Sequence, residues 1–217
     1  MIDSLLASIA HLIGAQTIAN IVDLDVQISF WMQNHLIMSW LTFVTYWASK
    51  ITSSGLLWIL ISVILMVQKK YRVVGLGMFV SLVLVFIIGD QTLKPHIQRL
   101  RPFVQFPDVV VPAMSANPKT FSFPSGHATG SFSSSVALFL GLRYMAPKKA
   151  FWGLWAIIFA AFVGFARIYL FAHFTSDVVV GAILGAILCV VAWGIAKKLS
   201  AVKALEPLFT FSLGKRK

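Results

Sequence analysis

Cysteine and acidic side chains are scarce in this sequence, and their scarcity excludes several kinds of site. Cys189 is the only cysteine among 217 residues, so the chain can form no intrachain disulfide and no thiolate metal site. Asp and Glu together number 7 and lie scattered along the chain, which leaves no acidic cluster to hold Mg²⁺. We therefore expect a protein that works without a metal and without a cofactor.

Basic residues are missing from the start of the chain. The sequence opens with MIDSLLASIA and has no Lys or Arg before Lys50. A secretory signal peptide begins with a basic n-region, so we expect that this segment is not one.

Long apolar runs are abundant instead. Apolar residues make up 59% of the chain and charged residues 12%, whereas a soluble domain is nearer to about 45–50% and about 25%. Five blocks of about 17–19 residues are uncharged except for Arg143 in one of them, and this length spans a bilayer. The blocks are Ile51–Gln68, Val73–Gly89, Gly130–Ala146, Ala150–Ala166 and Val178–Ala196.

These blocks predict an all-α fold, a polytopic membrane helix bundle with five transmembrane helices. A sixth span is expected within residues 1–50, where the aromatic-rich stretch Ser29–Ala48 either crosses the bilayer or lies in its interface. Residues 1–217 read as a single domain, with an N-terminal helical region (1–50), a motif loop (90–129) and a basic tail (197–217). The small-residue pattern Gly181–Gly185 favours close helix packing.

The formal net charge of +11 is distributed unevenly. If the blocks cross alternately, twelve of the basic residues fall on one side of the membrane and six on the other. This layout follows the positive-inside rule and argues against nucleic-acid binding. We expect a multi-pass protein of a bacterial inner membrane, with a cytoplasmic C-terminus. The loop 90–129 and the turn 167–177 then lie together at the periplasmic or extracellular face.

Two polar segments meet at that outer face, and the first is KPHIQRLRP. Lys94 and Arg101 are seven residues apart, so they share a helix face if the helix continues, and Pro102 then ends it or turns the chain. Considered alone, Lys94 and Arg101 could also be two surface cations whose long side chains reach toward lipid headgroups.

The stretch FPSGH follows this segment. Pro124 fits the first turn of a helix capped by Ser122, which leaves the backbone N–H groups of Ser125, Gly126 and His127 free. A helix start of this kind binds anions, although the same letters also fit a plain helix N-terminus.

The second polar segment, RIYLFAHFTSD, contains His173 four residues before Asp177. On a helix the carboxylate can accept a hydrogen bond from one imidazole nitrogen, which leaves the other as a nucleophile or base. Arg167 lies six residues before His173, so the chain must bend near Leu170–Ala172 for the two to converge. Three cations, an anion-binding helix start and two histidines together suit phosphoryl transfer.

The sequence resembles the type-2 phosphatidic acid phosphatases, whose signature has the three parts K-x6-RP, PSGH and SR-x5-H-x3-D. Lys94 to Pro102, Pro124 to His127 and Arg167 to Asp177 match them in order. Ala166 replaces the usual Ser, which puts a supporting hydrogen bond in doubt. The resemblance implies a helical fold, usually with six spans, and also the roles of the residues. His173 is then the nucleophile, Asp177 orients it and His127 is the general acid. The phosphate-binding residues are then Lys94, Arg101, Ser125, Gly126 and Arg167.

The expected function is hydrolysis of a phosphate monoester or pyrophosphate on a membrane lipid through a phosphohistidine. Phosphatidylglycerophosphate, phosphatidic acid and undecaprenyl pyrophosphate all fit, and the motifs do not choose among them. A lipid A phosphatase or a lipid-to-lipid phosphotransferase would use the same site. An anion transporter is a remote alternative, because charge gathers at one face and not near the midplane. The loop Phe103–Phe121 is expected to influence substrate choice, and the oligomeric state stays open.

Overall fold

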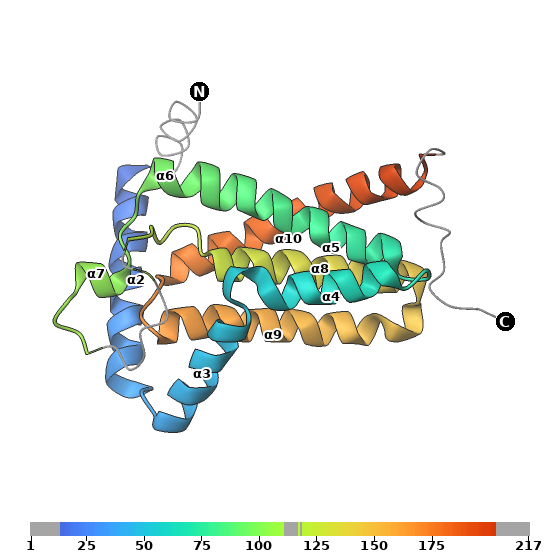
Figure 1. The fold of residues 1–217 in the computed structure, drawn as a ribbon. Helices are drawn as coiled ribbons and strands as arrows, with labels where there is room; N and C mark the ends of the chain where they lie inside the picture. Colours follow the sequence, from blue (N-terminus) through green and yellow to red (C-terminus); the bar gives the residue numbers. More distant parts are fainter. Residues whose placement is uncertain (1–13, 111–116, 118, 203–217) are drawn as a thin grey trace.

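The computed structural model describes residues 14–110, 117 and 119–202, and within them every regular element is helical (Figure 1). Residues 1–13 and most of the basic tail therefore lie outside the described residues, as do six residues of the loop at 111–116 and Pro118. The long helices are α2 (Ala15–His35), α3 (Ser39–Ile51), α4 (Leu56–Val67), α5 (Arg72–Val85), α8 (Gly126–Met145), α9 (Ala150–Tyr169) and α10 (Thr175–Ser200). The short ones are η1 (Ser53–Gly55), the π-helix η2 (Phe86–Leu93), α6 (Lys94–Ile97), α7 (Pro102–Gln105) and η3 (Pro147–Lys149).

Three helical stretches in the described residues are long and apolar enough to cross a membrane: Arg72–Gln105, Pro147–Tyr169 and Thr175–Ser200. A fourth is the pair Ser39–Ile51 and Ser53–Val67, which is bent by 45°. The all-helical fold is therefore confirmed, and the chain is a multi-pass membrane protein. Three predicted blocks, Val73–Gly89, Ala150–Ala166 and Val178–Ala196, lie within helical segments, and Gly130–Ala146 ends one residue beyond α8. The block Ile51–Gln68 begins at a bend, where Ser54 and Gly55 have positive φ.

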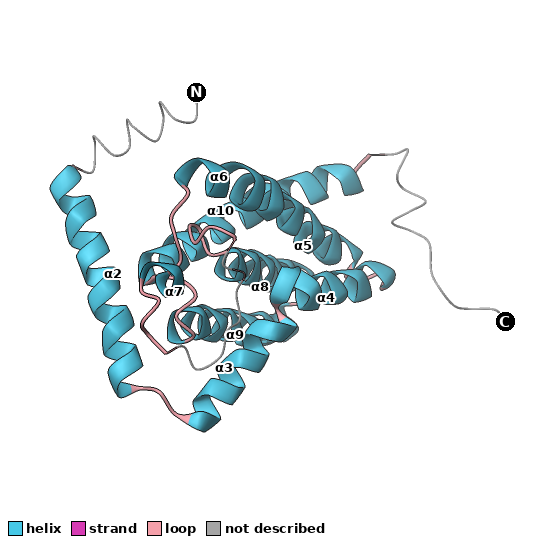
Figure 2. Ribbon diagram, turned by 60° about the vertical axis from the view of Figure 1, so that its left-hand side comes forward, coloured by secondary structure: helices cyan, strands magenta, loops and turns pink. Residues whose placement is uncertain are grey.

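Helix α8 lies among the other long helices and packs against α5, α9 and α10 (Figures 1 and 2). Small residues allow this close packing. A Cβ atom added to Gly153 of α9 would lie 2.3 Å from Cα of Phe139, and one added to Gly185 of α10 would lie 2.3 Å from the carbonyl oxygen of Thr129. The packing predicted from Gly181 and Gly185 is therefore confirmed, since a Cβ on Gly181 would lie 2.9 Å from Oγ1 of Thr129.

The stretch Ser29–Ala48, expected either to cross the bilayer or to lie in its interface, is divided between two helices. Helix α2 ends at His35 and α3 begins at Ser39, because an extended residue, Met38, turns the chain between them. The buried hydroxyl of Tyr169 stabilises this turn: it accepts from Met38 N–H at 3.1 Å and also contacts Oγ1 of Thr42 at 2.8 Å. Helix α2 consequently lies across the end of the bundle at which α6 and α7 are also found, while α4, α5, α8, α9 and α10 run side by side (Figures 1 and 2).

Candidate active site

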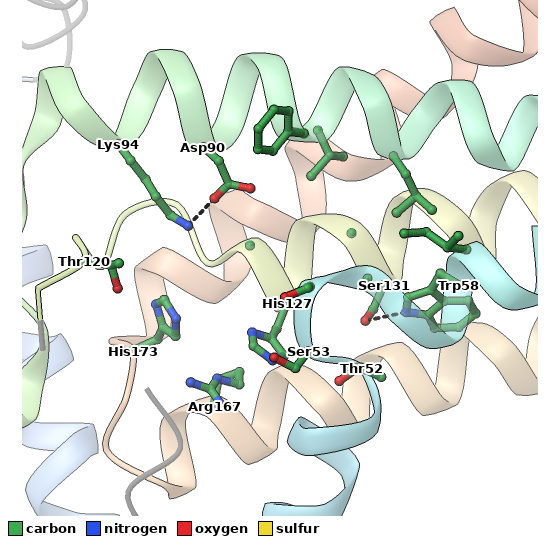
Figure 3. A pocket seen from close by; sticks show the side chains of 18 of the residues that line it. Thr52, Ser53, Trp58, Asp90, Lys94, Thr120, His127, Ser131, Arg167 and His173 are labelled. Atoms are coloured by element: carbon green, nitrogen blue, oxygen red, sulfur yellow. Dashed lines mark hydrogen bonds and ion pairs between the residues drawn. The ribbon is translucent and has the colours of Figure 1, made fainter. Parts of the chain in front are cut away.

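A cavity of about 680 Å³ lies toward the end of the bundle that α6 and α7 occupy. Six of the eight predicted site residues line it: Lys94, Arg101, Gly126, His127, Arg167 and His173. The other two, Ser125 and Asp177, are fully buried behind the wall. Figure 3 shows Lys94, Arg167 and His173 pointing into the cavity from three separate parts of the chain.

His173 lies in the loop between α9 and α10, and the predicted bend before it is confirmed. Helix α9 ends at Tyr169, and Phe171 adopts a positive φ of 55°. The N–H of His173 then returns to the carbonyl oxygen of Arg167 at 3.2 Å, which brings these two residues to the same cavity. His173 precedes α10, so it does not share a helix face with Asp177 as the spacing predicted.

The imidazole of His173 is held between Arg101 and Ser122. Nη1 of Arg101 lies 2.8 Å from Nε2, and Oγ of Ser122 lies 3.4 Å from Nδ1. Because a guanidinium can only donate, Nε2 must accept, and the ring proton is on Nδ1. The unprotonated nitrogen therefore belongs to the ring edge that Arg101 faces.

The sequence predicted a direct hydrogen bond from His173 to Asp177. The structure shows none, because Oδ2 of Asp177 lies 3.7 Å from Nδ1 of His173. The hydroxyl of Ser122 donates to Oδ2 instead, as does the N–H of Phe174 at 2.9 Å. Nη1 of Arg99 donates to Oδ1 at 2.6 Å. Sequence reasoning missed Arg99, although it is a third cation in the same polar segment, and it assigned Ser122 to a helix cap.

The segment with Lys94 and Arg101 is not one helix, so the condition under which the two residues would share a helix face is not met. Helix α6 ends at Ile97, Gln98 has a left-handed φ of 51°, and Arg101 is extended. Pro102 begins α7 and does not end a helix. The extended backbone directs the Arg101 side chain to Thr120, Ala172 and His173.

Lys94 points into the cavity beside an acid that sequence reasoning did not assign to the site. Its ammonium donates to the carboxylate of Asp90, one turn earlier and on the cavity wall (Figure 3). Gly126 lies next to this pair: a Cβ there would sit 3.3 Å from Nζ of Lys94. The lack of a side chain at this position keeps room beside the cation.

Helix α8 begins at Gly126, and its N-cap is Ser125 and not Ser122. Pro124 precedes the helix. The N–H of Ser125 was predicted to be free, but it donates to the carbonyl oxygen of Asp177 at 3.1 Å. The N–H groups of Gly126 and His127 have no hydrogen-bond partner among the residues that the structure describes, and they belong to a cavity-lining helix start.

His127 lies on the first turn of α8, and its Nε2 is 3.1 Å from the carbonyl oxygen of Ser49. A carbonyl accepts, so Nε2 carries the proton and Nδ1 has the lone pair. Arg167 of α9 is 1% exposed and lines the same cavity. The cavity thus places two histidines and three cations around one space.

Burial lowers the pKa of His173 well below its ordinary value, and the positive charges of Arg101, Arg167 and Lys94 lower it further. The imidazole is consequently neutral near pH 7, with its lone pair on Nε2. No group of three His, Cys, Asp or Glu side chains able to hold a metal ion occurs in the described part of the chain.

Comparison with known proteins places this geometry in context. The profile of the PAP2 superfamily matches residues 70–201. The chain is 32% identical over 130 residues to the undecaprenyl-diphosphatase of Sulfolobus acidocaldarius, covering 59% of this chain and 58% of the relative. It is 30% identical over 142 residues to phosphatidylglycerophosphatase B of Bacillus subtilis, covering 58% and 66%. The chain thus spans less than two thirds of the length of either curated relative.

Two solved structures share the fold. The PAP2-type phosphatidylglycerolphosphate phosphatase of Bacillus subtilis superposes with a TM-score of 0.67 at 24% identity, covering 89% of this chain and 93% of that one. LpxE of Aquifex aeolicus gives a TM-score of 0.60 at 21% identity, covering 79% and 95%.

Proposed function

The chain belongs to the PAP2 superfamily, and on this premise we propose that it is a membrane lipid phosphatase that works through a phosphohistidine on His173. One observation supports this proposal above the others. Arg101, Arg167 and Lys94 surround the same cavity as the unprotonated Nε2 of His173. Cations aimed at one point stabilise the charge of a transferring phosphoryl group.

In the first step, Nε2 of His173 attacks phosphorus, and the bond from phosphorus to the leaving oxygen breaks. His127 takes up a proton from solvent on Nδ1 as the anionic phosphate binds, and this imidazolium is the acid that protonates the leaving oxygen. Arg101 leaves Nε2 and donates to a phosphoryl oxygen, while the N–H groups of Gly126 and His127 hold another. The phosphoimidazole retains its proton on Nδ1, and the Ser122–Asp177 pair stabilises the positive charge that the ring acquires.

In the second step, water attacks phosphorus on the side that the leaving group occupied. His127, now neutral, takes a proton from this water, and the nitrogen–phosphorus bond breaks. Inorganic phosphate leaves, and the imidazole of His173 is again neutral. His127 and the attacking water account for the protons in these two steps, and side chains supply the positive charge, so we expect turnover in the presence of a metal chelator.

The walls of the cavity favour a lipid as substrate. Away from the cations the lining is apolar, with Ile59, Phe79, Leu82, Val83 and Phe86. A lipid can place its phosphate among the cations while its tail lies along these side chains. Relatives are named as an undecaprenyl-diphosphatase, a phosphatidylglycerophosphatase and, in Bacteroides thetaiotaomicron, a lipid A 4'-phosphatase, so these three substrate classes are the first to test.

We further propose five membrane crossings, with the bent α3–α4 pair and α5, α8, α9 and α10. Helix α8 runs beside the others, and its lower hydropathy reflects small serine and glycine residues that face its neighbours. The turns α4–α5 and α8–α9 and the end of α10 share the end of the bundle opposite the cavity (Figure 1). They carry Lys69, Lys70, Arg72, Arg143, Lys148, Lys149, Lys197 and Lys198. This end is then cytoplasmic, and the cavity opens at the periplasmic or extracellular side of a bacterial inner membrane.

Phosphate release by the purified full chain tests the function. Phosphatidylglycerophosphate, phosphatidic acid, undecaprenyl pyrophosphate and lipid A are presented in detergent micelles with EDTA. We expect release from at least one lipid, and loss of release in His173→Ala and His127→Ala but not in His35→Ala, which alters an exposed histidine. The proposal fails if the wild type hydrolyses none of the four or if EDTA abolishes turnover. Transfer of the phosphate to a second lipid, without release, would instead indicate a phosphotransferase.

A further inference from the structure

Asp25 of α2 is a buried acid that binds the start of α10. Asp25 is 2% exposed, and it contacts Ser176 although the two residues are 151 positions apart in the sequence. Oδ1 accepts from the N–H of Ser176 at 2.8 Å, and Oδ2 accepts from the Ser176 hydroxyl. Ser176 precedes Asp177 directly, so Asp25 fixes the first turn of α10 from outside that helix.

Arg99 joins Asp25 to Asp177. Its Nη2 donates to Oδ2 of Asp25 at 2.7 Å, and its Nη1 donates to Oδ1 of Asp177 at 2.6 Å. The guanidinium also stacks 4.2 Å above the ring of Phe174, which holds its plane. One cation thus neutralises two buried carboxylates in a geometry that the flat, forked guanidinium provides and an ammonium cannot.

Asp177 connects this pair to the imidazole of His173. Its Oδ1 is taken by Arg99, so its Oδ2 faces the N–H of Phe174 and the hydroxyl of Ser122. Oγ of Ser122 in turn lies 3.4 Å from Nδ1 of His173. A continuous series of polar contacts therefore runs from α2 to the ring nitrogen opposite Nε2.

We propose that Asp25 and Arg99 are positioning residues for His173. They fix the carboxylate plane of Asp177, and through Ser122 they keep the imidazole proton on Nδ1 and the lone pair on Nε2. Asp25 lies outside residues 70–201, so α2 contributes to the active site from beyond the matched family region. This inference rests on the proposed function.

Arg99 and Asp25 carry opposite charges, so removing one charge or the other should shift the pH dependence of activity in opposite directions. The ionisable groups that face His173 are Arg101, Lys94 with its partner Asp90, Arg167, His127 and Asp177. Arg99→Gln removes a positive charge from Asp177, so the imidazolium is stabilised and the acid limb of kcat/KM moves to higher pH. Asp25→Asn removes a negative charge from Arg99, so the limb moves to lower pH. A network that only stabilised the fold would not shift the limb in opposite directions.

The test compares full-length variants in detergent. Phosphate release is measured with the panel lipid that the wild type hydrolyses fastest, and kcat and KM are separated from pH 5 to 8 (about the range in which an imidazole titrates). We expect Asp25→Asn and Arg99→Gln to lower kcat by about 10- to 100-fold, with little change in KM. Asp25→Glu and Arg99→Lys should recover part of this loss. The matched controls are Asp23→Asn on the exposed side of α2 and Arg143→Gln, also exposed, which should behave as the wild type.

The tautomer of His173 is read independently by ¹⁵N NMR of histidine-labelled protein, with the His173 signal identified by its loss in His173→Asn. The wild type should show a protonated Nδ1, and Arg99→Gln or Arg99→Lys should weaken that preference. The inference is overturned if both charge-removing variants keep wild-type kcat and acid limb, or if the tautomer is unchanged in both Arg99 variants. A wild type that releases no phosphate would defeat the proposed function alone, because the tautomer measurement needs no turnover.

Discussion

Nη1 of Arg101 lies 2.8 Å from Nε2 of His173, so the proposed nucleophile is already in contact with a cation before substrate arrives. The contact directs the imidazole lone pair into the cavity and disfavours its protonation. It must also be exchanged for a contact to phosphate when Nε2 attacks. Arg101 therefore has two successive roles in the proposed mechanism, and both depend on the position of its guanidinium.

Arg101→Lys should lower kcat/KM by about 10²- to 10³-fold, as the loss of a preorganised donor to a developing anion does elsewhere. Besides His173, Arg101 donates to the carbonyl oxygens of Thr120 and Ala172, each at 3.0 Å. A single ammonium cannot make these contacts together. Steady-state phosphate release measures the loss, and Arg143→Lys, at an exposed site, is the control. Retention of more than half of the wild-type kcat/KM in Arg101→Lys would contradict the proposed role of the Arg101 guanidinium.

The lowered pKa of His173 predicts that acid weakens the fold. In the folded state the imidazole resists protonation because of burial and the nearby cations, whereas in the unfolded chain it takes up a proton below about pH 6.5. The unfolded state then binds more protons, so stability falls as pH decreases from about 6.5 toward the lowered folded-state pKa. Thermal unfolding in detergent should show this slope, and His173→Asn should flatten it. An unchanged slope in the variant would contradict the prediction.

Gly185→Ala should destabilise the bundle, because its Cβ would lie 2.3 Å from the backbone oxygen of Thr129. Helices α8 and α10 would have to separate, at a cost of about 1–3 kcal/mol. Gly194→Ala, on the same helix, is the control, since a Cβ there has nothing within 4 Å. The thermal midpoint in detergent should fall for the first variant only. Equal midpoints would show that the contact between these helices is less tight than described.

Asn117→Cys tests the proposed orientation. Asn117 lines the cavity, and the native Cys189 is buried, so a membrane-impermeant maleimide should label only the new thiol. In intact cells or spheroplasts we expect labelling from the outer side. Lys198→Cys, at the opposite end of the bundle, should react only after the membrane is opened. The reverse pattern would place the cavity at the cytoplasmic face.

Much of the helical layout was predictable because apolar runs between charged residues set the ends of helices. The block Ala150–Ala166 lies within α9, and Val178–Ala196 lies within α10. The bend before His173 was predictable for another reason: Arg167 could not otherwise reach the same space. These inferences use spacing along one segment, which a sequence contains directly.

The rest of the site depends on contacts between distant segments. Nothing in local spacing places Ser122 between Asp177 and His173, or Asp25 beside Ser176, since these pairs come from different helices and loops. The left-handed turn at Gln98 has no glycine to indicate it, so the helix from Lys94 seemed able to continue to Arg101. Such features follow from how the helices pack, and sequence patterns alone do not specify them.

Trapping the phosphoenzyme is the most direct test of a phosphohistidine on His173. The wild type is mixed with a hydrolysable lipid that carries ³²P at its phosphate, quenched in alkali and mapped by mass spectrometry. We predict an acid-labile label on the imidazole of His173 that is absent from His173→Asn. Label on any other residue, or phosphate release with no labelled enzyme at any time during turnover, would contradict the mechanism.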